Sequence, residues 1–316
     1  MYMNGLCFLT SISEDIHYRT AQYIPNKKSE TYQNALKDII ALYHKTEFKL
    51  KNIYCNNKFK NFFYDLANKF QININTVPAQ AHVSKAERNI RVIKEKVRSN
   101  VHNLPYNKIP GIILIYIVQE TAKKLNYFPV KDGVSPYYSP RAILTKITLN
   151  YLTHGIHYTG EFVMAHNDEA VKNSLNLRAL ECIYLRFTDT IYNKHELYHI
   201  PTKCVIKQRS CTSTKMLDNM INLLEEQASD QKMPLGINFI QTIKDDLFAG
   251  VEDHTSRNNK DDLFAGVEDN NDITGIESDE NNVDYTTIDD ELYEPSSFLT
   301  PNKKIKSESM TLTINT

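Results

Sequence analysis

The chain has 316 residues, 41% of them hydrophobic, which is enough for a core in one or two domains followed by a tail. Its formal net charge of −1 conceals two opposite parts, because residues 245–294 contain 17 Asp and Glu against 2 Lys and Arg. Residues 1–244 are correspondingly basic. A basic body favours a polyanionic partner such as a nucleic acid.

Five scattered cysteines without a C-x-x-C pair argue against a disulfide framework and against a zinc knuckle, and they predict a reducing compartment. The longest apolar run, residues 112–118, is too short to span a bilayer, and the N-terminus lacks a signal-peptide pattern. We therefore expect a soluble intracellular protein without a membrane partner. A basic cluster at residues 301–306 favours the nucleus over the cytoplasm, although a solvated tail explains it equally well.

Strands and helices alternate in the first part of the chain. Asn4-Gly5 is a type I′ hairpin signal between two β-like runs, and helical spacing alternates with strand-like alternation further on. The predicted elements are strands at 1–3, 6–12 and 18–24, a helix at 29–44, a strand at 48–55, a helix at 58–69 and a strand at 72–77. This order predicts a mixed α/β sheet with flanking helices.

The next helix is the most informative stretch. Ser84 and Glu87 form an S-x-x-E capping box, which predicts that a helix begins here, and the apolar residues that follow form one buried stripe. Its wet face is cationic and is formed by Arg88, Arg91, Lys94 and Arg98. A carboxylate at the head of such a face suits phosphate contacts beside a metal ion. On the helix alone, a capping residue on a solvated face is the plainer explanation.

Beyond this helix we expect a core helix at residues 112–126, several short strands between 160 and 210, and an amphipathic helix at 215–227. Residues 244–253 recur almost unchanged at 260–269, which indicates a tandem duplication in a disordered segment. The predicted domains are a sheet-and-helix core at 1–150, a small β-barrel-like module at 151–212, a helical extension at 213–240 and a disordered acidic tail at 241–316.

One sharp motif match is misleading. His195-Glu196-Leu197-Tyr198-His199 fits H-E-x-x-H, which holds zinc when it lies on a helix. Here Pro201 follows at once and the flanking residues are β-formers, so we expect a strand. Along a strand the two histidines would lie about 13 Å apart, too far to share a metal ion.

Several segments, taken in order, resemble one known family across roughly the first two thirds of the chain. They are Asn4-Gly5 with Phe8-Leu9, Arg19-Thr20-Ala21 with Tyr23-Ile24-Pro25, Cys55-Asn56-Asn57-Lys58-Phe59, Val83 to Glu95, Asn126 to Pro129, Ser139 to Thr145 and, more loosely, Arg178 to Leu185. Their order and spacing resemble the integrase core of copia-type retrotransposon polyproteins.

The resemblance implies a ribonuclease H-like fold with a D, D, E triad that binds Mg²⁺ and joins element DNA to target DNA. Glu87 falls on the family's glutamate and Asn56 on its second aspartate, while Lys58 replaces a family acid. The first aspartate would lie about two residues before Met1. An Asn keeps the shape of Asp and loses its charge, so we expect Mg²⁺ not to be bound productively and catalysis to be negligible.

The expected function is therefore that of an inactive integrase-like protein of a transposable element, related to DNA integration, which binds DNA through its basic core and which could form a homo-oligomer. Two alternatives stay open. The chain is a fragment of a longer functional reading frame that supplies the first aspartate upstream, or it is an adopted, non-enzymatic interaction protein with an acidic tail.

Overall fold

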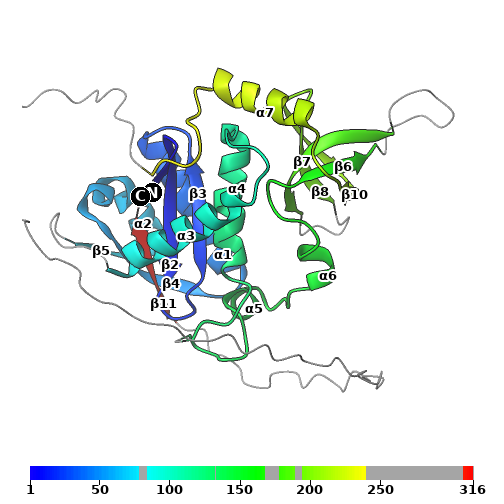
Figure 1. The fold of residues 1–316 in the computed structure, drawn as a ribbon. Coiled ribbons are helices and arrows are strands. Elements are labelled where there is room, and N and C mark those ends of the chain that lie inside the picture. The colour runs from blue at the N-terminus through cyan, green and yellow to red at the C-terminus, as the bar shows by residue number, and fades with distance from the viewer. Residues whose placement is uncertain (78–83, 132, 168–177, 189–193, 240–308, 316) are drawn as a thin grey trace, which may run out of the picture. The chain divides into compact units, whose positions relative to one another are not determined.

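The computed structural model describes the chain except residues 78–83, 132, 168–177, 189–193, 240–308 and 316 (Figure 1). Two sheets and their helices belong to one compact unit, formed by Met1–Thr242 together with Ile305–Thr316. No helix among the described residues is both long and apolar enough to cross a membrane. The repeated segments at 244–253 and 260–269 lie outside the described residues.

The larger sheet is mixed and has six strands. In chain order these are β1 (Tyr2–Met3), β2 (Leu6–Ser13), β3 (Arg19–Ile24), β4 (Lys49–Asn56), β5 (Asn73–Val77) and β11 (Ser309–Asn315). The first three strands are antiparallel, and β4 runs parallel to β5. The turn between β1 and β2 has positive φ at both Asn4 and Gly5, which confirms the predicted type I′ hairpin.

The C-terminal strand β11 lies inside this sheet, between β2 and β4 (Figure 1). It runs antiparallel to β2 and parallel to β4, with Leu312 opposite Ser13 on one side and Ile53 on the other. The prediction that the tail is disordered to its end is therefore wrong for these residues. The acidic composition of the tail says nothing about a short alternating segment at its end, which can pair with two strand edges.

β11 also lies in line with β1. Both strands run antiparallel to β2 along the same edge, because β3 covers the other edge. Asn315 pairs with Thr10, and Met1 exchanges two backbone hydrogen bonds of 2.8 Å with Phe8, so only one β2 position separates the two ends. The N and C labels accordingly fall beside each other in Figure 1.

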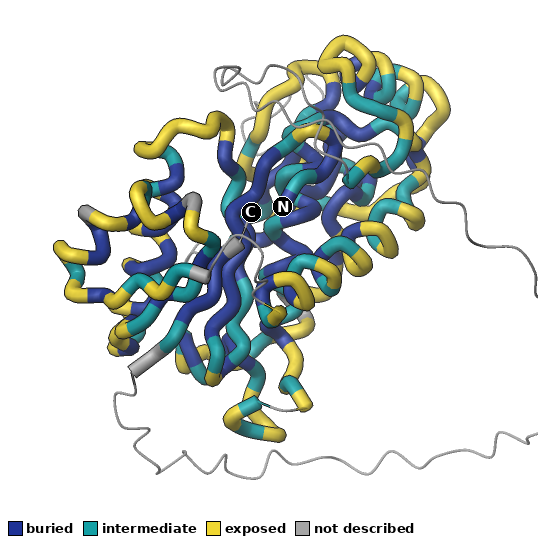
Figure 2. Tube along the Cα trace, turned by 90° about the vertical axis from the view of Figure 1, so that its left-hand side faces the viewer, coloured by how far each residue is buried: buried dark blue, intermediate teal, exposed yellow. Residues whose placement is uncertain are grey.

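Helices cover both faces of the six-stranded sheet, whose middle strands are buried (Figure 2). On one face, α1 (Ser29–Lys45) and α2 (Lys60–Phe70), which follows a 3-10 turn at Asn57–Phe59, enclose a core. On the other face lie α3 (Ser84–His102) and α4 (Gly111–Lys124). They pack against the alternate strand side chains, which point away from α1 and α2. These bounds confirm the predicted order of strands and helices through the first half of the chain.

The second sheet is antiparallel and has the strand order β10-β6-β7-β8-β9. Its strands are β6 (Phe162–His166), β7 (Ala179–Phe187), β8 (His195–His199), β9 (Cys204–Gln208) and β10 (Cys211–Ser213), preceded by the short helices α5 (Pro140–Thr145) and α6 (Tyr151–His154) and followed by α7 (Asp218–Asp230). The predicted short strands are thus confirmed. The pairings form an open row with β10 and β9 at its edges.

One hydrophobic core joins the two sheets. It contains Phe8 from β2, Ile117 from α4, Ile183 from β7 and Leu224 from α7, all buried. The parts of the chain before and after the expected domain boundary near residue 150 therefore share one apolar core. Burial of this kind supplies most of the favourable free energy of folding, so the sheets stabilise each other.

Candidate nucleic-acid interface

Two hydrogen bonds hold the head of α3 over β2. Lys85 Nζ donates to the Glu14 carbonyl oxygen at 2.7 Å, and Asn89 Nδ2 donates to the Ser11 carbonyl oxygen at 3.4 Å. These contacts place the first two turns of α3 above the C-terminal half of β2, where β11 is the neighbouring strand. The described part of α3 begins at Ser84, the residue at which the capping box places the helix start.

The sheet surface under this part of α3 is polar and uncharged. Leu312 and Ile314 belong to the core beneath α1 and α2, so Thr313 between them faces α3. Thr313 Oγ1 and Asn89 Oδ1 are both buried and have no hydrogen-bond partner among the described residues. A buried polar atom without a partner costs about 1–3 kcal/mol, so these two atoms destabilise the contact between α3 and the sheet.

Asn56 and Glu87, which the sequence resemblance assigns to metal-ligand positions, lie on two different elements. Asn56 is the last residue of β4 and is half-buried, while Glu87 is exposed in the first turn of α3. Within the described part of the chain, no group of three His, Cys, Asp or Glu side chains could hold a metal ion. Asn56 carries no charge, so of this pair only Glu87 could bind Mg²⁺ through a carboxylate.

The cationic face of α3 divides into two parts. Arg88 and Arg91 are exposed near the head of the helix. Lys94 and Arg98 lie under the ring of Phe239, with Lys94 Nζ 5.1 Å and Arg98 Cζ 4.9 Å from its centroid. Burial, followed by the charge of Arg98, lowers the pKa of Lys94. These two cations are therefore already engaged within the protein.

Phe239 reaches α3 through a segment that returns from α7. The backbone N–H of Asn4 donates to the Asn238 carbonyl oxygen at 2.7 Å, and the side-chain Nδ2 of Asn4 donates to the Gly236 carbonyl oxygen at 2.9 Å. Arg98 Nη1 also donates to both carboxylate oxygens of Glu95. Local sequence reading missed the role of Phe239, because an isolated aromatic residue after a helix carries no signal of its distant partner.

The H-E-x-x-H segment forms strand β8, as predicted from its flanks. Glu196 is buried and accepts hydrogen bonds from Arg186 Nε at 2.7 Å and the Tyr116 hydroxyl at 3.1 Å, with Lys207 Nζ at 3.3 Å. These partners make Glu196 a structural anion that ties β8 to β7, β9 and α4. In a strand its position does not suit the role of a base beside a helical zinc site.

The sequence matches the model of no known protein family, and no curated protein is detectably similar to it.

Proposed function

We propose that this protein is a degenerate copia-type integrase core that binds nucleic acid through the head of α3 and carries out no strand transfer. A ribonuclease H-like fold, followed by a small β-barrel-like module, is part of the same proposal. The order of sequence segments listed above supports it, as does the alternation of strands and helices around a mixed sheet. The observation that carries the binding proposal is the exposure of Arg88 and Arg91 on a helix whose N-terminal end also favours anions.

Binding of this kind contacts the phosphate backbone and reads no base sequence. Each neutralised phosphate releases counterions, so affinity falls with salt with a slope of about −0.9 per contact on duplex DNA. Glu87 lies beside Arg88 and opposes the approach of phosphate, which limits the strength of the interface. We expect affinity at low salt that is lost as salt rises.

The test replaces both exposed arginines by glutamate, Arg88→Glu with Arg91→Glu, in the full chain. Fluorescence anisotropy with a labelled duplex should give weaker binding and a salt dependence that is flatter by about 2 in slope. Lys37→Glu on α1 is the control, because Lys37 is also exposed but belongs to the other helical layer. Equal salt slopes for the arginine variant and the unmodified chain would remove α3 from the interface.

Catalysis is tested separately. A strand-transfer assay with Mg²⁺ or Mn²⁺ should give the same background with the unmodified chain and with Glu87→Gln, because no group of three His, Cys, Asp or Glu side chains among the described residues could hold a metal ion. Product from the unmodified chain above that of the Glu87→Gln variant would contradict the loss of catalysis and leave the binding proposal standing.

A further inference from the structure

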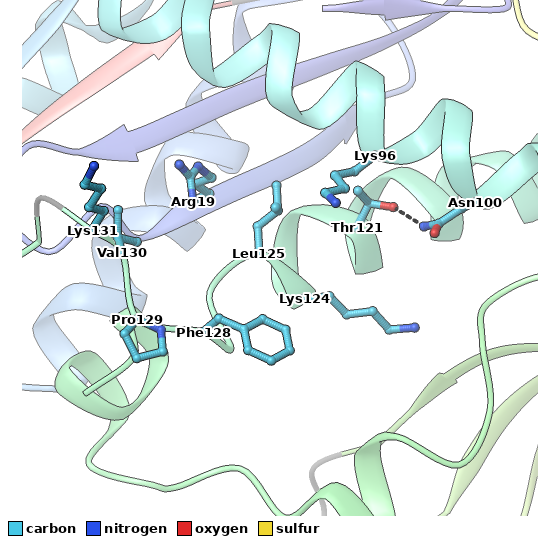
Figure 3. A pocket seen from close by; sticks show the side chains of 10 residues that line it. All are labelled: Arg19, Lys96, Asn100, Thr121, Lys124, Leu125, Phe128, Pro129, Val130 and Lys131. Carbon is cyan, nitrogen blue, oxygen red and sulfur yellow. Dashed lines mark hydrogen bonds between the residues drawn. The ribbon is translucent and has the colours of Figure 1, made fainter. Parts of the chain in front are cut away.

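A cavity of about 480 Å³ lies between α3, the end of α4, the start of β3 and the segment that follows α4 (Figure 3). Four cationic side chains line it, namely Arg19, Lys96, Lys124 and Lys131, together with the aromatic ring of Phe128. No carboxylate is among the described residues that line it. Its volume falls in the range of small-molecule sites in proteins.

The walls of this cavity are built by specific hydrogen bonds. Buried Asn126 accepts from the Arg19 amide at 2.7 Å and donates to the Arg19 carbonyl oxygen at 2.8 Å, which fixes the backbone of that residue. On the opposite wall, Asn100 Nδ2 donates to Thr121 Oγ1 at 2.9 Å and ties α3 to α4, as Figure 3 shows. The cations are thus presented by elements that are held in place.

No carboxylate among the described lining residues balances the cations of the cavity, although the carboxylates of Glu120 and Glu161 act on Lys124 from outside it. Arg19 Nε is buried and has no hydrogen-bond partner among the described residues. Burial lowers the pKa of Arg19, and it lowers the pKa of Lys124 in spite of the nearby carboxylate of Glu120. The negative end of the α4 dipole amounts to about half a charge, which is small against four cations. An anion would therefore gain charge-assisted hydrogen bonds here.

The aromatic ring decides which anion fits best. Phe128 is 58% exposed at the rim, so its ring is open to a planar partner. A base stacked on an aromatic side chain gains about 1–3 kcal/mol, and a guanidinium fork matches the oxygens of a phosphate. A flat ring joined to a phosphate satisfies both features at once.

We propose that this cavity is a nucleotide site, in which the cations that line it hold the phosphate and Phe128 stacks on the base. This goes beyond binding at the head of α3, because Lys96 and Asn100 line the cavity from later turns of α3 than Arg88 and Arg91. The nucleotide is either free or part of a nucleic-acid strand that carries a terminal phosphate.

Calorimetric titration of the full chain with ATP, tripolyphosphate and adenosine separates the contributions. We expect ATP to bind best, tripolyphosphate to bind more weakly and adenosine not to bind measurably. Phe128→Ala should lower ATP affinity about tenfold and leave tripolyphosphate unchanged. Lys124→Gln should lower the affinity for both about tenfold. Lys37→Gln, on the far helical layer, is the matched control and should change neither.

Lys131→Gln serves as a second charge variant, because Lys131 is exposed and its replacement leaves the core untouched. No saturable ATP binding in the millimolar range, or equal ATP affinity in the Phe128, Lys124 and Lys131 variants and the unmodified chain, would overturn the proposal. Competition between ATP and a 5′-phosphorylated oligothymidylate assigns the site to strand ends, and its failure to compete assigns the site to free nucleotides. The Arg88 and Arg91 double variant should bind ATP normally, so the two proposals fail independently.

Discussion

Two neighbouring residues in β8 have opposite chemical surroundings. Burial by itself raises the pKa of the Glu196 carboxyl, but hydrogen bonds and charge from Arg186, with further hydrogen bonds from Tyr116 and Lys207, outweigh it and lower the pKa. Burial, and then the nearby His157, lowers the pKa of His195. Its Nδ1 is buried without a hydrogen-bond partner among the described residues, and the ring lies 5.7 Å from that of Tyr184.

The depressed pKa of His195 predicts a pH dependence of stability. The unfolded chain takes up a proton near the ordinary imidazole pKa of about 6.5, whereas the folded chain resists protonation, so the free energy of unfolding falls as pH decreases from about 7 to 5. His195→Gln should flatten this dependence. Urea unfolding at several pH values measures it.

The control for this experiment is His102→Gln, because His102 is exposed at the end of α3. That variant should keep the full pH dependence of the unmodified chain. Identical pH profiles for the His195 variant and the unmodified chain would mean that other groups, such as the acid–base cluster around Glu196, account for the dependence.

At the scale of elements, the C-terminal strand β11 is needed to complete the six-stranded sheet, because it lies between β2 and β4. Leu312 and Ile314 are fully buried, and the strand supplies hydrogen bonds to both β2 and β4. Removing it would leave two strand edges facing an empty place in the middle of a sheet. The C-terminal residues are therefore part of the core of the fold.

A single substitution tests this dependence. Leu312→Ala should lower the free energy of unfolding by about 2–5 kcal/mol, because it leaves a cavity between α1, α2 and the sheet. Leu235→Ala is the matched control, since Leu235 is 71% exposed, and it should change stability by less than about 0.5 kcal/mol. The measurement is the urea midpoint, and similar midpoints for the two variants would show that β11 does not pack as described.

The local elements could be predicted because each carries its own periodic signal. The hairpin at Asn4-Gly5, the start of α3 at Ser84 and the strand at His195–His199 follow from turn residues, caps and flanks. The residues of β11 alternate too, but nothing local identifies partners almost 300 positions away. The same limit applies to Phe239 over α3, to the cavity at Arg19, and to the polar atoms under α3, which are brought together only by tertiary packing.

At the scale of the whole molecule, α4 is the element that binds the two sheets together. Ile113, Leu114, Ile117 and Val118 are all fully buried, and they share a core with β2, β7 and α7. A helix apolar on several sides is the sequence sign of this position, as predicted for residues 112–126. Unfolding of the two sheets should accordingly be one cooperative transition.

The alignment of β11 with β1 makes the two chain ends parts of one interrupted strand. The protein is therefore a natural candidate for circular permutation. A permuted chain that begins at Ile305, passes from Thr316 through a two-residue linker to Met1 and ends at Thr242 would omit residues 243–304. It should fold to the same sheet, and its free energy of unfolding should rise by up to about 3 kcal/mol, because the connection between β11 and the rest of the unit becomes much shorter.

Urea unfolding of the permuted and the original chain measures the difference in stability. If β11 pairs with β2 and β4 as described, the permuted chain must fold, and its failure to fold would contradict this pairing. If it folds, the fold is determined by which strands pair in the sheet, and it does not require that β11 come last in the chain. The place of β11 in the sheet would then be set by its pairing with β2 and β4, and not by its connection through residues 243–304.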